Sequence, residues 1–266
     1  MKSFADSVSP KNFPVKVEEK RQSTYEYMKL HSNYLKSQYG ELSEWNEFYE
    51  FIDSIEYYKY GHQCHHFYRY LSTYGEIIKK VGTIKRKNIL VTGGKCPITE
   101  YLSNTNKCYL SESDLRTSID APDNYANIII SLEVLEHIKD SPEKSMSEIV
   151  LFQESGARQY AREVCRTLKK KGLLILTTPN PNSYRSILQS IQHNSPGIFR
   201  PHVREYTKQE VRQIFSDMKV IRYKSMHNMF YIGGSHLEPE AQFKSMQWST
   251  KKRGDNHFFI FKNQRQ

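Results

Sequence analysis

Alternation of apolar runs with helical segments constrains the fold of this chain more than any other feature. Three runs are rich in branched apolar residues: NILVT (88–92), ANIIIS (126–131) and GLLILTTP (172–179). A helical pattern over 157–171 leads into the third run. Buried strands that alternate with helices need crossover connections, which produce a parallel sheet. We therefore predict an α/β protein with a doubly wound, mostly parallel sheet, plus a weaker strand at 107–111 and edge strands at 220–226 and 257–262.

The segment before this sheet has a different composition. Residues 1–20 are polar and contain two prolines, which predicts a flexible arm. Over 21–85 apolar residues recur at helical spacing, and Gly82 is a plausible helix end. We interpret 21–85 as an N-terminal helical cap and 86–266 as the main domain. These helices either pack on the domain or form a lid over a substrate, and both alternatives stay open at this point.

Composition narrows the classes of protein that the chain can belong to. With 38% hydrophobic residues it can bury a core, and no apolar run approaches the ~20 residues of a membrane span. The first residues lack the apolar block of a signal peptide, and the four cysteines form no CxxC pair. We therefore expect a cytoplasmic protein with no membrane partner. The net charge of +10 is compatible with a nucleic-acid partner, but its even spread favours a lysine-rich surface.

Polar residues follow the predicted strands where each strand ends. The sequence SLEVLEHIKD places Glu133, Glu136 and His137 at i, i+3 and i+4, directly after the apolar run 128–130. Gly93 and Gly94 follow the first strand in the same way, as do residues 177–180 after the last. Ligands of such sheets bind beyond the carboxyl ends of the strands. We therefore expect these groups to converge on one crevice.

An ordered set of motifs resembles one enzyme family. NIIISLEVLEHIKD, EVCRTLKKKGLLILTTPNPNSY, FRPHVREYTKQEVRQIF and RGDNHFFIFK look like the later motifs of class I S-adenosylmethionine-dependent methyltransferases. They are most similar to the small-molecule branch with a Glu-x-x-Glu-His turn, and the resemblance covers about residues 86–263. It implies a Rossmann-like fold, S-adenosylmethionine as cofactor, and O-methylation of a small-molecule hydroxyl on a sugar or secondary metabolite. It also implies these cofactor-binding residues: Gly93, Gly94, Asp114, Ser131, Leu132 and Glu133.

The front of the domain departs from the family pattern. The first strand of the family normally ends in an acidic residue and a Gly-x-Gly-x-Gly turn, whereas this chain has ILVTGGKCP. The acidic position falls on Leu90 or Val91, and two glycines still permit a tight turn. Asp114, or Glu112, stands where a carboxylate would hold the ribose. Because the turn is eroded, a non-catalytic, methyltransferase-like binding protein is an alternative.

The histidines suggest how methyl transfer would proceed. His137 is the candidate base, because imidazole titrates near neutrality, and Glu136 and His202 are predicted to act with it. Glu133, Glu136, His137 and His202 also match the ligand positions of metal-dependent small-RNA 2′-O-methyltransferases. That resemblance implies a site for magnesium, manganese or zinc, and RNA as an alternative acceptor. The simpler alternative is that Glu136 and His137 cap a helix.

Overall fold

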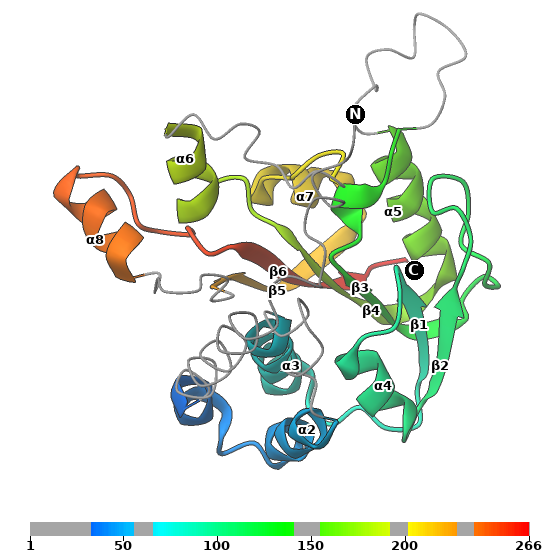
Figure 1. Ribbon diagram of the computed structural model, residues 1–266. Helices are drawn as coiled ribbons and strands as arrows, with labels where there is room; N and C mark the ends of the chain where they lie inside the picture. The colour runs from blue at the N-terminus through cyan, green and yellow to red at the C-terminus, as the bar shows by residue number, and fades with distance from the viewer. Residues whose placement is uncertain (1–32, 56–65, 141–154, 192–201, 228–236, 266) are drawn as a thin grey trace, which may run out of the picture.

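The computed structural model describes residues 33–55, 66–140, 155–191, 202–227 and 237–265 (Figure 1). Its centre is a six-stranded sheet in the order β2-β1-β3-β4-β6-β5, in which β6 runs antiparallel to both neighbours. The strands have these bounds: β1 Asn88–Thr92, β2 Lys107–Ser111, β3 Ala126–Leu132, β4 Leu168–Pro179, β5 Met218–Met226 and β6 Asn256–Asn263. This arrangement confirms the predicted mostly parallel α/β sheet. The expected arm at 1–20 lies outside the described residues.

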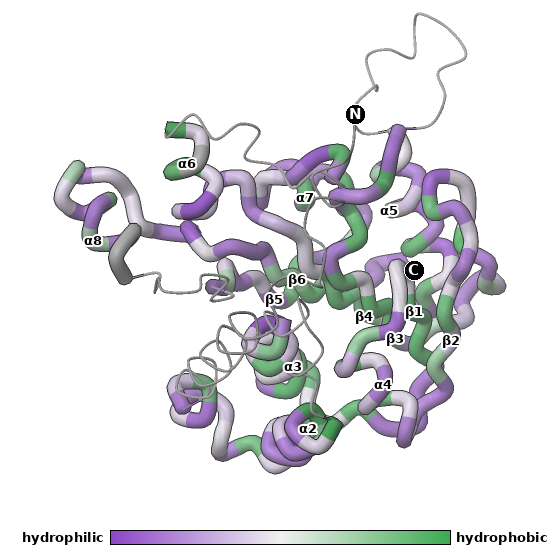
Figure 2. Tube along the Cα trace, in the orientation of Figure 1, coloured by the Kyte–Doolittle hydropathy of each residue, from purple (hydrophilic) through white to green (hydrophobic). Residues whose placement is uncertain are grey.

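Alternate residues of the central strands face two separate cores. Ile128 and Ile130 of β3 belong to one buried cluster, whereas Ile129 between them belongs to the other. Phe258 and Phe259 of β6 divide in the same way. Successive strand side chains point to opposite faces, so a run of branched apolar residues fills both cores only where helices cover both faces. Figure 2 shows these apolar strands between two layers of helices.

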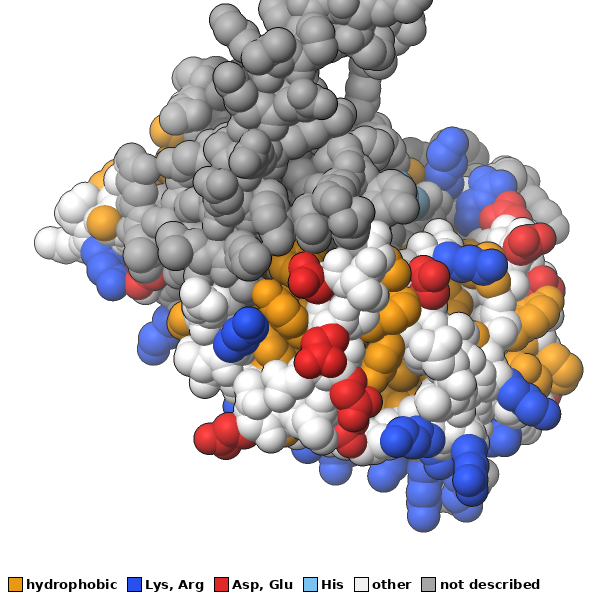
Figure 3. Space-filling view, turned by 60° about the horizontal axis from the view of Figure 1, so that its bottom comes forward, with side chains coloured by type: hydrophobic (Ala, Val, Ile, Leu, Met, Phe, Trp, Pro, Cys, Tyr) orange, Lys and Arg blue, Asp and Glu red, His pale blue; other side chains and the backbone are white. Residues whose placement is uncertain are grey.

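One face of the sheet is covered by α2 (Ser43–Ser54), α3 (Phe67–Val81) and α4 (Pro97–Ser103), and the other by α5 (Ser155–Thr167) and α7 (Lys208–Ile214) (Figure 1). Two further helices, α6 (Tyr184–Ile191) and α8 (Leu237–Ser245), lie against each other. The outer surface of the first layer carries acidic side chains over its middle and basic ones along its lower edge (Figure 3). No described helix has the length and apolar character needed to cross a membrane.

The N-terminal helices share a core with the sheet. Trp45 and Phe48 of α2 are fully buried in the same cluster as Ile89 of β1 and Ile260 of β6. The Trp45 indole Nε1 donates to the Leu71 carbonyl oxygen at 2.9 Å, which joins α2 to α3. The described part of the predicted cap therefore completes one face of the sheet.

One predicted helix end is confirmed, whereas another predicted helix end and one predicted strand position are wrong. Gly82 ends α3 with φ 75°, as predicted, and Thr207 and Glu210 form a capping box at the start of α7. However, the predicted helix over 157–171 ends at Thr167, and the lysines that follow belong to β4. The predicted edge strand over 257–262 instead lies inside the sheet as β6. Strand β6 pairs with β4 on one side and with β5 on the other, so β5 is the edge strand at this end of the sheet.

Candidate functional site

Three adjoining cavities lie at the carboxyl ends of β1, β2, β3 and β4. The histidine cavity, of about 320 Å³, has walls that include Arg69, Glu136 and His202. The Asp114 cavity, of about 480 Å³, and the glycine-turn cavity, of about 150 Å³, both border Gly93. Glu133 and His137 line both the histidine cavity and the Asp114 cavity. The predicted convergence of these strand ends is therefore observed.

The turn after β1 needs glycine at two successive positions. Gly93 has φ 94°, and a Cβ atom there would lie 2.3 Å from Cγ2 of Val134. Gly94 has φ 137°, and a Cβ atom there would meet no other atom within 4 Å. Positive φ angles are accessible to glycine at little cost. The turn therefore brings bare backbone to the glycine-turn cavity, which Leu132 also lines.

Asp114 lies in the second cavity, but Arg116 holds its carboxylate. The Arg116 Nη2 atom donates to Asp114 Oδ2 at 2.7 Å, and Nε donates to both carboxylate oxygens at 3.0 Å. Hydrogen bonds from Arg116 lower the pKa of Asp114. Glu112, the other predicted ribose partner, is exposed and is not among the residues that line this cavity.

Ser131 lies beneath the cavities rather than in their walls. Its side chain is fully buried, and its Oγ accepts a hydrogen bond of 2.9 Å from the Tyr160 hydroxyl. The same hydroxyl lies 2.8 Å from Oγ1 of Thr92. Burial raises the pKa of Tyr160 to about 12. The Tyr160 hydroxyl of α5 therefore joins Ser131 of β3 to Thr92 of β1 under the site.

Glu133 is held by donors from two distant elements. Its backbone is left-handed, with φ 57°, a conformation that costs free energy for a residue with a side chain. The Asn256 Nδ2 atom of β6 donates to its two carboxylate oxygens at 2.6 and 2.7 Å. Arg69 Nη1 of α3 lies 3.1 Å from Oε2. These contacts fix the carboxylate at the junction of the two larger cavities.

Glu136 is a buried carboxyl group with one unpartnered oxygen. Its Oε2 accepts a hydrogen bond of 2.9 Å from Thr178 Oγ1 of β4. Its Oε1 has no hydrogen-bond partner among the described residues and lies 4.0 Å from His202 Nε2. Burial, followed by repulsion from Glu133, raises the pKa of Glu136 well above its ordinary value. Buried oxygens without a partner are costly, so Oε1 is suited to carry a proton or to contact a ligand.

Two histidines face this carboxyl group. The rings of His137 and His202 meet edge to face with centroids 4.8 Å apart, and one ligand atom each from Glu136, His137 and His202 lies within 4.8 Å of the others. The Val203 backbone N–H donates to the Glu136 carbonyl oxygen at 2.8 Å, which fixes His202 beside the turn. The group can therefore move a proton or hold a divalent cation. Glu133, the fourth predicted metal ligand, lies outside this cluster.

Asn256 was not predicted from the sequence as a site residue, whereas Thr178 lies in the strand end 177–180 that was expected at the crevice. In the β4–β6 register Asn256 pairs with Pro179, which brings the start of β6 to the end of β4. The sequence RGDN, directly before the apolar run HFFIF, could have indicated Asn256 as a site residue. A strand antiparallel to β4 begins where β4 ends, so its first polar residue lies at the site. Arg69 and His66 also line the histidine cavity.

Comparison with known proteins identifies the family. A family model described as a methyltransferase domain matches residues 79–218, more than half of the chain. No curated protein sequence matches.

Solved structures of similar fold include the methyltransferase bound to the Trm112 activator in Haloferax volcanii, with 10% identity and TM-score 0.46, covering 82% of this chain and 97% of that one. The N-methyltransferase NodS of Bradyrhizobium japonicum is 10% identical, with a TM-score of 0.45; the match covers 74% of this chain and 97% of NodS. The phosphoethanolamine N-methyltransferase 2 of Haemonchus contortus is 11% identical, with a TM-score of 0.49; the match covers 82% of this chain and 60% of that enzyme.

Proposed function

This chain belongs to the class I S-adenosylmethionine-dependent methyltransferases, and on that premise we propose that it methylates a hydroxyl group of a small molecule. Bound S-adenosylmethionine supplies an electrophilic methyl group. Gly93, Gly94 and Leu132 would hold this cofactor, because the glycine turn leaves backbone open to the cavity that they line. Asp114 would border its ribose from the adjoining cavity.

The observation that carries the proposed mechanism is the position of His137. Its ring lines both the cavity beside the glycine turn and the histidine cavity. In-line transfer requires the acceptor oxygen to lie next to the methyl group, so a base is effective only where the two ligands meet. We propose that His137 removes the hydroxyl proton, and that Glu136 and His202 position its ring.

The size of the histidine cavity favours a small acceptor. Its volume of about 320 Å³ is at the lower end of the range for small-molecule sites, about 300–1,000 Å³. Arg69 lies in the first turn of α3, and His66 is the residue before that helix. The helical cap therefore supplies one wall of the cavity. We propose that the cap over 21–85 takes part in acceptor binding, and that the transferase domain spans 86–266.

Substitution of His137 tests this mechanism. In His137→Gln we expect methyl transfer to fall by about 10²- to 10⁴-fold, the usual contribution of a general base. Affinity for S-adenosylhomocysteine, measured by calorimetry, should change by less than about threefold, because the exposed ring does not support the core. Turnover is measured with radiolabelled cofactor and a panel of sugars, phenols and short RNA strands.

A matched variant, His227→Gln, makes the same substitution outside the three cavities and should keep wild-type turnover. Equal turnover in wild type and His137→Gln would remove His137 from the mechanism. Transfer to RNA alone would replace the small-molecule proposal with the RNA alternative. Absence of cofactor binding would favour the non-catalytic alternative.

The unpartnered Glu136 Oε1 atom favours a second candidate, a metal-assisted methyltransferase. Carboxylate oxygen and imidazole nitrogen suit magnesium, manganese or zinc, and Glu136, His137 and His202 offer both kinds of atom within one small cluster. A bound cation would lower the pKa of a hydroxyl group that it contacts. Glu133 would remain paired with Arg69 and Asn256 beside this site.

Metal binding is measured separately from turnover. We expect manganese to bind wild-type protein in calorimetry with one site, and to bind His202→Gln at least 10-fold more weakly, because one of three ligands is lost. His227→Gln again serves as the matched control. Equal manganese binding by wild type and His202→Gln, or full turnover after chelation, would reject this second candidate.

A further inference from the structure

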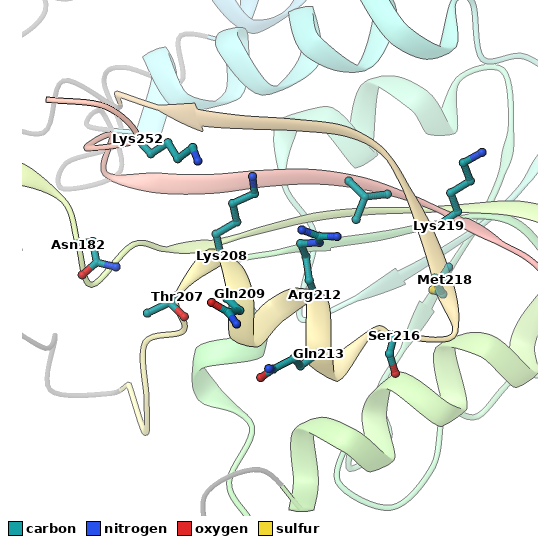
Figure 4. Close-up of a pocket in the computed structure, with 11 residues that line it drawn as sticks. Asn182, Thr207, Lys208, Gln209, Arg212, Gln213, Ser216, Met218, Lys219 and Lys252 are labelled. Carbon is teal, nitrogen blue, oxygen red and sulfur yellow. The ribbon is translucent and has the colours of Figure 1, made fainter. Parts of the chain in front are cut away.

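A separate basic groove lies between α7 and the edge strand β5. Its volume is about 1,030 Å³, and four cationic side chains line it: Lys208, Arg212, Lys219 and Lys252 (Figure 4). None of them lines the three cavities of the candidate active site. The groove therefore has a charge and a position that methyl transfer does not explain.

The groove holds no compensating negative charge within the described structure. Its other walls are neutral: Asn182, Thr207, Gln209, Gln213, Ser216, Met218 and Val220. Glu210 of α7 does not line the groove; its carboxylate pairs with Arg204 and accepts a hydrogen bond from the hydroxyl group of the wall residue Thr207. None of the four cations forms an ion pair with another described residue, and Lys208 lies only over the Tyr223 ring, 4.1 Å from its centroid.

Crowding of these cations makes an anionic ligand favourable. Burial, together with repulsion from Lys252 and Arg212, lowers the pKa of Lys208. A concave surface of one charge sign attracts and concentrates counter-ions. An anion bound in the groove would remove the mutual repulsion of the side chains that surround it.

The layout of the cations selects the kind of anion. Figure 4 shows them spread along the groove, from Lys252 before β6 to Lys219 on β5, rather than converging on one point. Spread cations suit a chain of phosphates better than a single phosphate, and a concave groove suits a strand better than a flat membrane. Among the residues that the structure describes, the groove walls include no aromatic side chain on which bases would stack. We propose that this groove binds the phosphate backbone of single-stranded nucleic acid without reading its bases.

Salt dependence of binding tests the proposal quantitatively. For four phosphate contacts on a single strand, the slope of log K against log salt should be about −2.8, since each contact contributes about −0.7. Affinity for a fluorescein-labelled 12-nucleotide oligouridylate, measured by anisotropy, should then fall about 50-fold between 50 and 200 mM salt. The variant Lys208→Gln/Arg212→Gln/Lys219→Gln/Lys252→Gln should lose at least 10-fold affinity at 50 mM salt, with a slope near zero.

A charge-matched control separates the groove from net charge. The variant Lys79→Gln/Lys80→Gln/Lys85→Gln/Lys107→Gln removes the same charge at exposed positions that do not line the groove, and it should keep the wild-type slope. Circular dichroism confirms that each variant is folded. Equal losses in both variants, or no strand binding by wild type, would overturn the proposal. Groove-dependent binding to phosphatidylserine vesicles but not to the oligonucleotide would also overturn it and assign the groove to a membrane.

Discussion

Two carboxyl groups three residues apart have opposite environments in this protein. Glu133 is paired with Arg69 and Asn256, whereas Glu136 is buried and one of its oxygens has no partner among the described residues. The Glu-x-x-Glu-His spacing predicted that these side chains share one site, and they do. It could not predict their pairing, because Asn256 lies 123 residues away in the sequence. Only the completed sheet brings that amide to the end of β3.

His257 makes stability depend on pH. Burial lowers its pKa from 6.5 to about 4, so the folded protein keeps this ring neutral where the unfolded chain binds a proton. Stability should therefore fall as the pH decreases from about 6.5 to 4. Between pH 7 and pH 4.5 we expect wild type to lose about 2–3 kcal/mol more than His257→Gln, which cannot titrate.

Urea unfolding at the two pH values measures this difference. The comparison uses the change in free energy of unfolding with pH for each protein, so any cost of the substitution at pH 7 cancels. Parallel pH dependence in wild type and His257→Gln would show that the ring is protonated equally in the folded and unfolded states.

At the scale of elements, one buried carboxylate joins the N-terminal helices to the sheet. Glu76 of α3 accepts hydrogen bonds from the Tyr39 hydroxyl at 2.6 Å and from Lys224 Nζ of β5 at 2.7 Å. Arg222 Nε of β5 donates to it at 2.9 Å. Glu76 is fully buried, so the carboxylate depends on these donors for compensation of its charge.

Neutralisation of Glu76 should weaken this connection. In Glu76→Gln the cations of Arg222 and Lys224 lose their partner while the side chain keeps its shape. We expect the free energy of unfolding to fall by about 1–3 kcal/mol, less than for a fully buried pair because both cations are partly exposed. Urea denaturation followed by circular dichroism measures the change.

The exposed Glu100 of α4 provides the matched control, and Glu100→Gln should lie within about 0.5 kcal/mol of wild type. A fall of the same size in both variants would indicate a general effect of lost negative charge. A Glu76→Gln variant as stable as wild type would show that the cluster does not contribute to holding the helices.

Element type was predictable where local sequence decides it. Branched apolar runs correctly predicted β1 and β3, and Gly82 correctly predicted the end of α3. The position of β6 was not predictable in the same way. Strand order depends on pairing between segments far apart in sequence, and alternation within one segment says nothing about whether one or both of its edges are paired.

At the scale of the whole molecule, the sequence motifs predicted the family and its fold, and both are confirmed. The family match begins at residue 79, inside α3. Yet Trp45, Phe48 and Leu71, all before that residue, fill the core that covers one sheet face. The motifs that carried the resemblance lie at 127–262, whereas α2 and most of α3 precede the matched residues. Their contribution to the histidine cavity was therefore harder to predict than the strand ends.

The place of β6 between β4 and β5 has a consequence for synthesis on the ribosome. Both neighbours emerge before the strand that pairs with them, so β5 has no partner in the sheet until residues 256–263 have left the exit tunnel. Until then the nascent chain presents an open β4 edge and two unfinished apolar cores. Such edges are templates for wrong pairing between chains. Molecular chaperones that shield nascent chains would therefore matter most for this protein after β5 has left the exit tunnel and before β6 has left it.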